Sequence, residues 1–289
     1  MTRAPLVPDE PPVASASGGA LAGLPAASLL LNPVRVVVFL VALIPFIVGC
    51  SICDHIVIQL PSRLSRNFRR RHYHRLWNGI IRFWGRGIWH LGQWILGLGL
   101  RIEGESPRGR HIVVSNHQST MDIVALFEAI PTLNLKFLAK SELARGIPNV
   151  SHALRHGGFG IVDFSNRRST LRGLGSFVKG LEEWDASPLI FPEGARTFDG
   201  SIGPFQRTGL LVLARDSGLP VLPVVIDGAW EARSLGRFFV HLPGSRIRIR
   251  ILPPLDAGTV ALRRDELHTM LEAMMRDELH RMRAAGATA

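Results

Sequence analysis

The sequence predicts an α/β fold, with a mixed and mostly parallel sheet flanked by helices and an N-terminal membrane-binding segment of two helices. Two observations carry this prediction. A long uncharged apolar run lies near the N-terminus, and short apolar runs alternate with stretches of helical periodicity from residue 101 onward. Strands that alternate with helices favour a sheet covered on both faces. We therefore divide the chain into a leader over 1–31, membrane-anchoring helices over 32–100 and an α/β domain over 101–289.

The leader over 1–31 is rich in Ala, Gly, Pro and Ser and lacks polar periodicity, which predicts a mostly disordered segment. A cleaved signal peptide is disfavoured, because the apolar run that follows begins late and is too long for the apolar part of such a peptide. Asn32 followed by Pro33 is typical of the start of a helix.

Residues 36–53 carry no charged side chain. As a helix they would span about 27 Å, close to the bilayer hydrocarbon core of about 30 Å, so we expect a membrane helix rather than a buried core helix. A basic cluster follows this run: Arg63, Arg66, Arg69, Arg70 and Arg71. Because positive charge stays on the cytoplasmic side, we expect everything after the cluster on the cytoplasmic side of the cell membrane, in contact with membrane lipids.

The segment 75–98 predicts a strongly amphipathic helix. Its apolar side chains recur at helical spacing: Trp77, Ile80, Ile81, Trp84, Ile88, Leu91, Ile95 and Leu98. Arg75, Arg82 and Arg86 fall near the opposite direction. Trp and Arg on one helix suit the lipid headgroup boundary, so we favour an interfacial helix over the alternative, a helix packed on a protein core.

The amino-acid composition limits the classes of molecule that the protein is expected to bind. The formal net charge of +11 favours an anionic partner, namely nucleic acid, anionic lipid headgroups, CoA phosphates or an acidic carrier protein. A nucleic-acid partner is disfavoured, because four of the six tryptophans lie between Trp77 and Trp94 and not beside basic residues of the α/β domain. Cys50 and Cys53 form an isolated pair, which supports neither a zinc site nor a disulfide framework. No cluster of metal-ligating residues is evident in the sequence, so no metal is expected, and no bound cofactor is expected either.

Within 101–289, apolar runs bounded by turn residues predict strands, and helical periodicity predicts the helices between them. The strands are expected at 111–115, 135–138, 159–162, 188–191, 221–226 and 246–252. The helices are expected at 121–129, 169–183, 209–216 and 262–282. The run 246–252 alternates Arg with Ile, as a half-exposed strand does.

Two motifs each follow an apolar run that predicts a buried strand: NHQSTMD at 116–122 and FPEGART at 191–197. His117 suits the removal of a proton from an alcohol near neutral pH, and Asp122, in the first turn of the following helix, can orient the imidazole ring. Glu193 suits an acceptor hydroxyl, and Arg196 suits a phosphate. Together the motifs predict a site that transfers a group to a hydroxyl, which itself attacks, so no Ser or Cys nucleophile is required.

These motifs resemble the His-x4-Asp and Glu-Gly-Thr-Arg blocks of the glycerolipid acyltransferases, the lysophosphatidic acid acyltransferase family. Ala195 stands where that family usually has Thr or Ser. The resemblance implies that His117 is the general base and Asp122 its partner. It also implies an acyltransferase domain that moves an acyl chain from acyl-CoA or acyl-carrier protein, a substrate and not a cofactor, to a lysolipid such as 1-acyl-glycerol-3-phosphate. The substrate-binding residues that it implies are Asn116, Lys140, Arg167, Glu193, Gly194 and Arg196.

One block departs from the family pattern. The run 136–143 resembles the segment whose second Lys, here Lys140, lies near the acceptor phosphate. The family then has Gly followed shortly by Ile-Asp-Arg, whereas Asp163 leads here to Phe164, and the next arginine is Arg167. Either Arg167 replaces the missing arginine, or the acceptor is a phosphate-free lysolipid such as lyso-ornithine lipid. A non-catalytic basic membrane protein and a hydrolase that activates water are the remaining alternatives.

Overall fold

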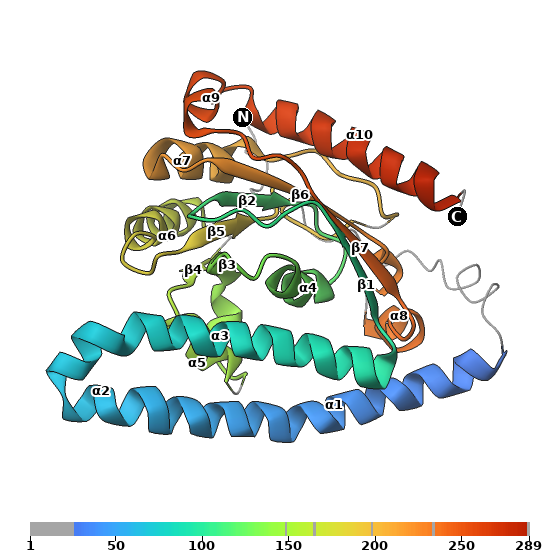
Figure 1. Ribbon diagram of the computed structural model, residues 1–289, viewed down its shortest axis with the longest axis horizontal. Helices are drawn as coiled ribbons and strands as arrows, with labels where there is room; N and C mark the ends of the chain where they lie inside the picture. Colours follow the sequence, from blue (N-terminus) through green and yellow to red (C-terminus); the bar gives the residue numbers. More distant parts are fainter. Residues whose placement is uncertain (1–25, 148, 164–165, 198, 233–234, 288–289) are drawn as a thin grey trace.

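The computed structural model describes residues 26–147, 149–163, 166–197, 199–232 and 235–287 (Figure 1). The strands within these ranges are β1 (Gly99–Glu103), β2 (Ile112–Ser115), β3 (Leu135–Lys140), β4 (Gly160–Val162), β5 (Ser187–Ile190), β6 (Val221–Asp227) and β7 (Arg246–Ile251). They form one seven-stranded sheet in the order β1-β7-β6-β2-β5-β3-β4. Neighbouring strands run parallel except β6 and β7, which are antiparallel. The predicted mixed, mostly parallel sheet is confirmed.

Helices cover both faces of the sheet (Figure 1). On one side lie α3 (Arg66–Leu96), α4 (Met121–Ala129), α5 (Val150–His156) and α8 (Leu235–His241), and on the other α6 (Arg167–Gly180), α7 (Arg207–Ser217), α9 (Ala257–Leu262) and α10 (Leu267–Ala287). Each face of the sheet has its own hydrophobic core, and strand β2 contributes to both. Val113 packs on the α4 side, whereas Ile112 and Val114 pack on the α7 side, because successive side chains of a strand alternate.

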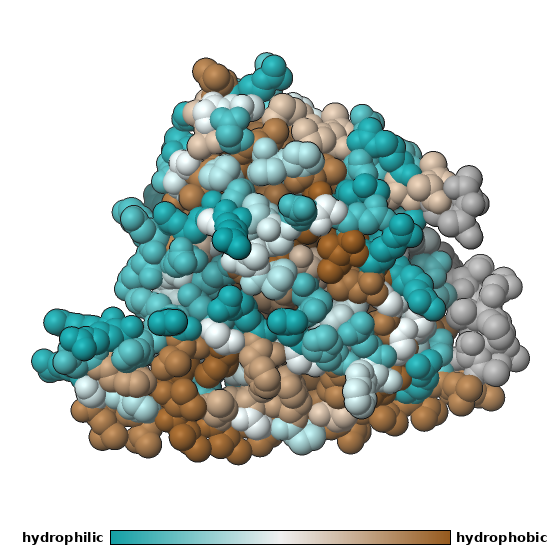
Figure 2. Space-filling model, viewed as in Figure 1, coloured by the Kyte–Doolittle hydropathy of each residue, from teal (hydrophilic) through white to brown (hydrophobic). Residues whose placement is uncertain are grey.

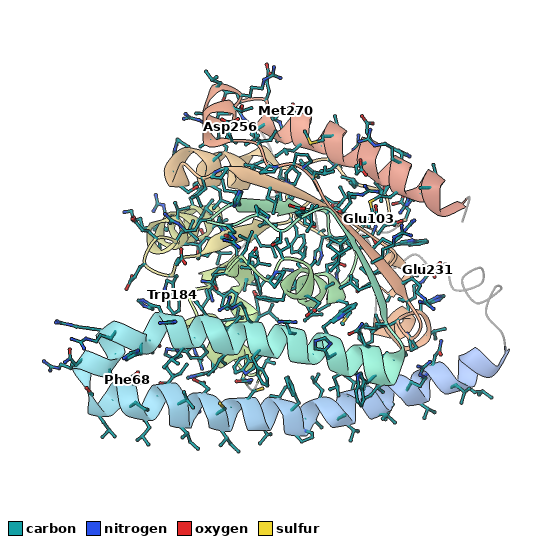
Figure 3. The ribbon with its side chains drawn as sticks, viewed as in Figure 1. Phe68, Glu103, Trp184, Glu231, Asp256 and Met270 are labelled. Carbon is teal, nitrogen blue, oxygen red and sulfur yellow. The ribbon has the colours of Figure 1, made fainter. Side chains whose placement is uncertain are left out.

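Strand β1 is an element that the sequence did not predict. It pairs in parallel with β7 at the edge of the sheet, and its residues are exposed or half-buried. Glu103, labelled in Figure 3, forms an ion pair with Arg250 of β7. A half-exposed edge strand with polar cross-strand pairs lacks the continuous apolar run that marks a strand buried on both faces.

Helix α1 (Ala26–Asp54) begins before the expected start at Asn32, so the proline after Asn32 lies inside the helix. The Asn32 side chain does not act as a cap, because its amide donates a hydrogen bond to the carbonyl oxygen of Val240 in α8, 2.7 Å away. A π-helical turn (His55–Gln59) and α2 (Leu60–Leu64) continue the helix. The expected leader lies outside the described residues as far as residue 25.

Helix α3 packs its apolar face on the protein core, which corrects the expectation of an interfacial helix. Trp77 is completely buried. A Cβ atom at Gly85 would lie 2.7 Å from the Phe127 ring of α4, and one at Gly87 would overlap the ring of Phe46 in α1, so both glycines permit close packing. Helical periodicity is the same for an apolar face that meets lipid and for one that meets protein, so the sequence pattern alone did not distinguish them.

The outward side of α1 carries a continuous apolar surface, which forms the brown base of the molecule in Figure 2. Its exposed side chains are Leu30, Leu31, Val34, Val37, Val38, Val41, Ile44, Val48 and Ile52, and Ile56 of the π-helical turn continues it. The opposite side of α1 packs along α3 through Val36 and Phe39. By length and composition alone, the helical stretch 30–64 could cross a membrane.

Candidate active site

The two motifs meet because β2 and β5 are neighbouring parallel strands, with Val113 opposite Leu189. The carboxyl ends of parallel strands lie at one edge of a sheet, where α/β folds collect ligands. His117 follows β2 at this edge, and Glu193 follows β5. Strand β6, on the other side of β2, ends at the same edge with Asp227.

His117 and Asp122 are in contact, as the sequence predicted. The Nδ1 atom of His117 lies 2.9 Å from Oδ2 of Asp122. The same Oδ2 atom accepts hydrogen bonds from the backbone N–H groups of Gln118 and Ser119, at 2.6 and 2.8 Å. Asp122 is completely buried, whereas 19% of the His117 side chain is exposed. The carboxylate therefore orients the ring so that Nε2 is the nitrogen available to exchange a proton with a substrate.

The second motif holds the backbone of the first. Oε1 of Glu193 accepts a hydrogen bond from the N–H of His117 at 2.8 Å, and the N–H of Thr197 donates to the carbonyl oxygen of His117 at 2.9 Å. The Phe191 ring stacks on the imidazole ring, with 4.2 Å between centroids and 19° between planes. Both polar groups of the His117 peptide and one face of its ring are thus bound by residues 191–197.

Glu193 and Gly194, expected from the sequence to contact substrate, shape and hold the backbone of the site in the structure. Oε2 of Glu193 accepts a hydrogen bond from the N–H of Gly203 at 2.9 Å, so both carboxylate oxygens are engaged by backbone. Burial, partly offset by these hydrogen bonds, raises the pKa of Glu193 to about 7. Gly194 has a φ of 74°, which favours glycine, and its N–H donates to the carbonyl oxygen of Phe191 at 3.1 Å. It therefore shapes the turn that carries Glu193.

Asn116, expected from the sequence to bind substrate, holds a neighbouring strand in the structure. Its Nδ2 atom donates to the carbonyl oxygen of Ile226, and its Oδ1 atom accepts from the N–H of Ile226, both at 2.8 Å. The side chain is completely buried. Asn116 therefore joins the carboxyl end of β2 to β6.

Gln118 and Asp227 belong to the site although the sequence did not point to them. Oε1 of Gln118 accepts from the N–H of Ala229 at 3.3 Å, and its Nε2 atom lies 3.4 Å from Oδ1 of Asp227. Asp227 accepts from Arg248 of β7 at 2.8 Å and from Arg283 of α10 at 2.9 Å. The position of Asp227 at the end of an apolar run could have indicated its place in the site. A side chain at the carboxyl end of β6 lies at the same edge of the sheet as His117.

The expected phosphate-binding residues lie at or beyond the same edge of the sheet. Nη1 of Arg196 donates to Oγ1 of Thr120 at 3.3 Å. Lys140 is exposed and ends β3, the strand next to β5. Arg167 is the first residue of α6, and only its backbone is described. Phe164 lies outside the described residues.

Among the described residues, no group of three or more His, Cys, Asp or Glu side chains could hold a metal ion. Cys50 and Cys53 are both free, with Cys50 buried and Cys53 exposed.

Comparison with known proteins gives consistent matches. A family model described as Acyltransferase matches residues 100–227. A 1-acyl-sn-glycerol-3-phosphate acyltransferase of Limnanthes douglasii is 31% identical over 180 residues, which cover 60% of this chain and 60% of the plant protein. The corresponding alpha enzyme of Mus musculus is 25% identical over 185 residues, 63% of each chain. The matched region thus spans less than two thirds of these curated relatives.

The fold has a counterpart among solved structures. The crystal structure of the 1-acyl-sn-glycerophosphate acyltransferase PlsC from Thermotoga maritima superposes with a TM-score of 0.66 and 25% sequence identity. The similarity covers 89% of this chain and 97% of that protein, so it includes the N-terminal helices as well as the sheet. The chain is thus similar to PlsC-like acyltransferases in its paired motifs, in its mostly parallel sheet and, over residues 100–227, in its match to the Acyltransferase family model.

Proposed function

We propose that the protein moves an acyl chain from acyl-CoA or acyl-carrier protein to the hydroxyl of a lysolipid, most directly 1-acyl-glycerol-3-phosphate, which gives phosphatidic acid. The contact between His117 and Asp122 carries this proposal. A partly exposed imidazole whose Nδ1 atom is bound to a buried carboxylate is suited to act as a general base through Nε2. The similarity to acyltransferases that act on 1-acyl-sn-glycerol-3-phosphate supports the choice of acceptor.

In this reaction Nε2 of His117 takes the hydroxyl proton while the hydroxyl oxygen bonds to the thioester carbonyl carbon. The carbon–sulfur bond then breaks, and the leaving thiolate takes the proton from the imidazolium. Asp122 stabilises the imidazolium in between. The acceptor hydroxyl is the nucleophile, so the step balances without an enzyme nucleophile.

The test is an assay of the purified full chain with labelled acyl-CoA and separate acceptors: lysophosphatidic acid, lyso-ornithine lipid, and none. We expect labelled phosphatidic acid, and a rate about 10²–10⁴ lower in His117→Ala. Turnover of lyso-ornithine lipid alone would select the phosphate-free acceptor that Phe164 suggests. Release of labelled fatty acid without an acceptor would select hydrolysis. Wild-type turnover by a folded His117→Ala protein would remove the proposed mechanism.

The acceptor phosphate can be tested through its proposed ligands. Lys140 ends β3, Arg196 follows the neighbouring strand β5, and Arg167 begins the helix beyond β4. Loss of one charge-assisted hydrogen bond costs about 1.5–3 kcal/mol, so Arg196→Ala should raise the KM for lysophosphatidic acid about tenfold or more. The KM for acyl-CoA should change less. Arg167→Ala should matter only if the acceptor carries phosphate.

We further propose that α1 lies in the surface of the cytoplasmic face of the cell membrane and does not cross it. Arg35 donates to the carbonyl oxygen of Ile95 at 2.9 Å, and Asn32 is bound to α8, so α1 is fixed along the body of the protein. A helix that spanned the bilayer in this position would draw the exposed Arg82 and Arg86 of α3 into the hydrocarbon. A helix with one apolar side and a basic neighbour suits the interface instead.

Vesicle flotation tests this placement. The full chain should float with phosphatidylcholine vesicles and stay bound at high salt, because apolar contacts are not screened. Burial of one large apolar side chain is worth about 1.5–3 kcal/mol, so Ile44→Asn and Ile52→Asn should each weaken binding about tenfold. Leu262→Asn is the matched control, since Leu262 is 89% exposed on α9, away from α1. Complete release by salt would instead support a purely electrostatic attachment.

A further inference from the structure

A groove of about 410 Å³ lies on the outer surface between α3 and α4. Residues that line it include Gly79, Arg82, Phe83 and Arg86 of α3, Phe127 of α4 and Pro131. A Cβ atom at Gly79 would meet nothing within 4 Å, so this glycine leaves space that a larger side chain would occupy. The groove combines apolar walls with basic side chains.

Arg82 is the cation of this groove that no acid neutralises. Arg86 donates to Oε2 of Glu128 at 2.8 Å, and His90, also at the groove, lies 3.8 Å from the same oxygen. Among the described residues, Arg82 has no hydrogen bond or ion pair. Its exposed guanidinium can therefore bind an external anion without breaking an existing contact.

The buried Lys136 of β3 interacts electrostatically with Arg82. The Lys136 ammonium group is completely buried, without a hydrogen-bond partner among the described residues. It lies 4.9 Å from the centre of the Phe159 ring and 5.4 Å from that of Trp184, which Figure 3 shows beside the N-terminal half of α3. Burial, and then the positive charge of Arg82, lower the pKa of Lys136 to about 7. An anion bound at Arg82 would offset this unfavourable pair of like charges.

We propose that the groove binds the phosphate headgroup of an anionic membrane phospholipid, with Arg82 as its ligand and the acyl chains left in the bilayer. The groove adjoins the apolar surface of α1, because the ring centre of Phe83 lies 6.2 Å from that of Phe46 in α1. A membrane that receives α1 therefore brings headgroups to Arg82. The proposal rests on the membrane placement of α1 and not on catalysis. The groove lies near the carboxyl end of α4, whereas the site residue Asp122 lies in the first turn of α4.

The test compares binding of the full chain to vesicles of phosphatidylcholine with and without phosphatidylglycerol. Arg82→Gln removes the charge and keeps the space, whereas Gly79→Leu keeps the charge and fills the space. Arg75→Gln is the matched control, since Arg75 is exposed on α3 two turns before Arg82 and outside the groove. Both groove variants should lose about tenfold in affinity for the anionic vesicles. Arg75→Gln should lose no more affinity than one basic residue near a charged surface contributes, which is about fivefold.

Several outcomes overturn the proposal. Equal losses in Arg82→Gln and Arg75→Gln would mean diffuse attraction to the surface, and wild-type affinity in Gly79→Leu would mean that the groove stays empty. Competition by glycerophosphate, lost in Arg82→Gln, would assign the site to a soluble phosphate compound and not to a lipid. Failure of the wild-type protein to bind either vesicle would refute the membrane placement itself. Normal binding to neutral vesicles with no gain from phosphatidylglycerol would refute the headgroup site alone.

Discussion

Replacement of Glu193 by Gln separates the two roles that this carboxylate can have. Its oxygens accept backbone hydrogen bonds from His117 and Gly203, at 2.8 and 2.9 Å. A Gln side chain has a single acceptor oxygen, and its NH₂ group would face the second backbone N–H. One N–H group in this buried region then loses a charge-assisted hydrogen bond, which is worth about 1.5–3 kcal/mol.

If the lost bond is the one to His117, the base shifts and kcat falls. A barrier higher by about 1.5–3 kcal/mol corresponds to a rate about 10- to 150-fold lower, with little change in either KM. The measurement is the steady-state kinetics of purified Glu193→Gln with both substrates, beside circular dichroism as a check of the fold. An increase in the KM for the acceptor at unchanged kcat would refute this reasoning, because it would mean that Glu193 binds the acceptor hydroxyl, as the sequence suggested.

The same variant tests the pKa of Glu193, which burial raises from 4.5 to about 7. The folded protein holds a proton that the unfolded chain releases between these two values. This contribution to stability is fully present below a pH of about 4.5 and is lost as the pH rises through about 7, at about 1.4 kcal/mol per pH unit, or roughly 3 kcal/mol in all. Glu193→Gln cannot titrate, so its free energy of unfolding should depend less on pH in this window. An identical slope in both proteins would contradict the raised pKa.

Further substitutions test the site and the packing of α3. Asp122→Asn should lower kcat about 10²–10⁴-fold in a folded protein, because the imidazolium loses its carboxylate partner and the ring loses its preferred tautomer. A kcat within a few-fold of the wild-type value would argue against Asp122 as the residue that orients His117. Gly85→Ala should lower the free energy of unfolding by about 1–3 kcal/mol, because its Cβ atom would lie 2.7 Å from the Phe127 ring. Gly79→Ala on the same helix should raise it by about 0.5–1 kcal/mol, because its Cβ atom meets open space. Denaturant unfolding measures both, and effects of the same sign would contradict the described packing.

The strands around the site were predictable because they are buried on both faces. β2 and β5 each contain a short apolar run, at 112–114 and 188–190, and their observed positions, 112–115 and 187–190, differ by one residue at most from the expected ends. The contact between His117 and Asp122 was predictable for another reason. Both residues lie within one short segment at the start of a helix, so local geometry alone brings them together.

The roles of Asn116 and Glu193 could not be read from local sequence. Each side chain binds backbone that is far away in the chain, at Ile226 and His117 respectively, and no periodicity marks these partners. A buried polar side chain next to a catalytic residue looks the same in sequence whether it faces substrate or holds a neighbouring strand. Only the arrangement of β2, β5 and β6 distinguishes the two.

The second motif holds His117 by its backbone and by one face of its ring, while Asp122 of the first motif binds Nδ1. The N–H of His117 is bound by the Glu193 side chain, its carbonyl oxygen by the Thr197 backbone, and its ring by Phe191. The chain departs from the family pattern at Ala195, between these residues. The departure leaves the arrangement intact, because each contact is made by a carboxylate, a backbone N–H or an aromatic ring, and none needs a hydroxyl at position 195. The paired motifs therefore form one unit, in which a carboxylate and a turn after β5 hold the base that follows β2.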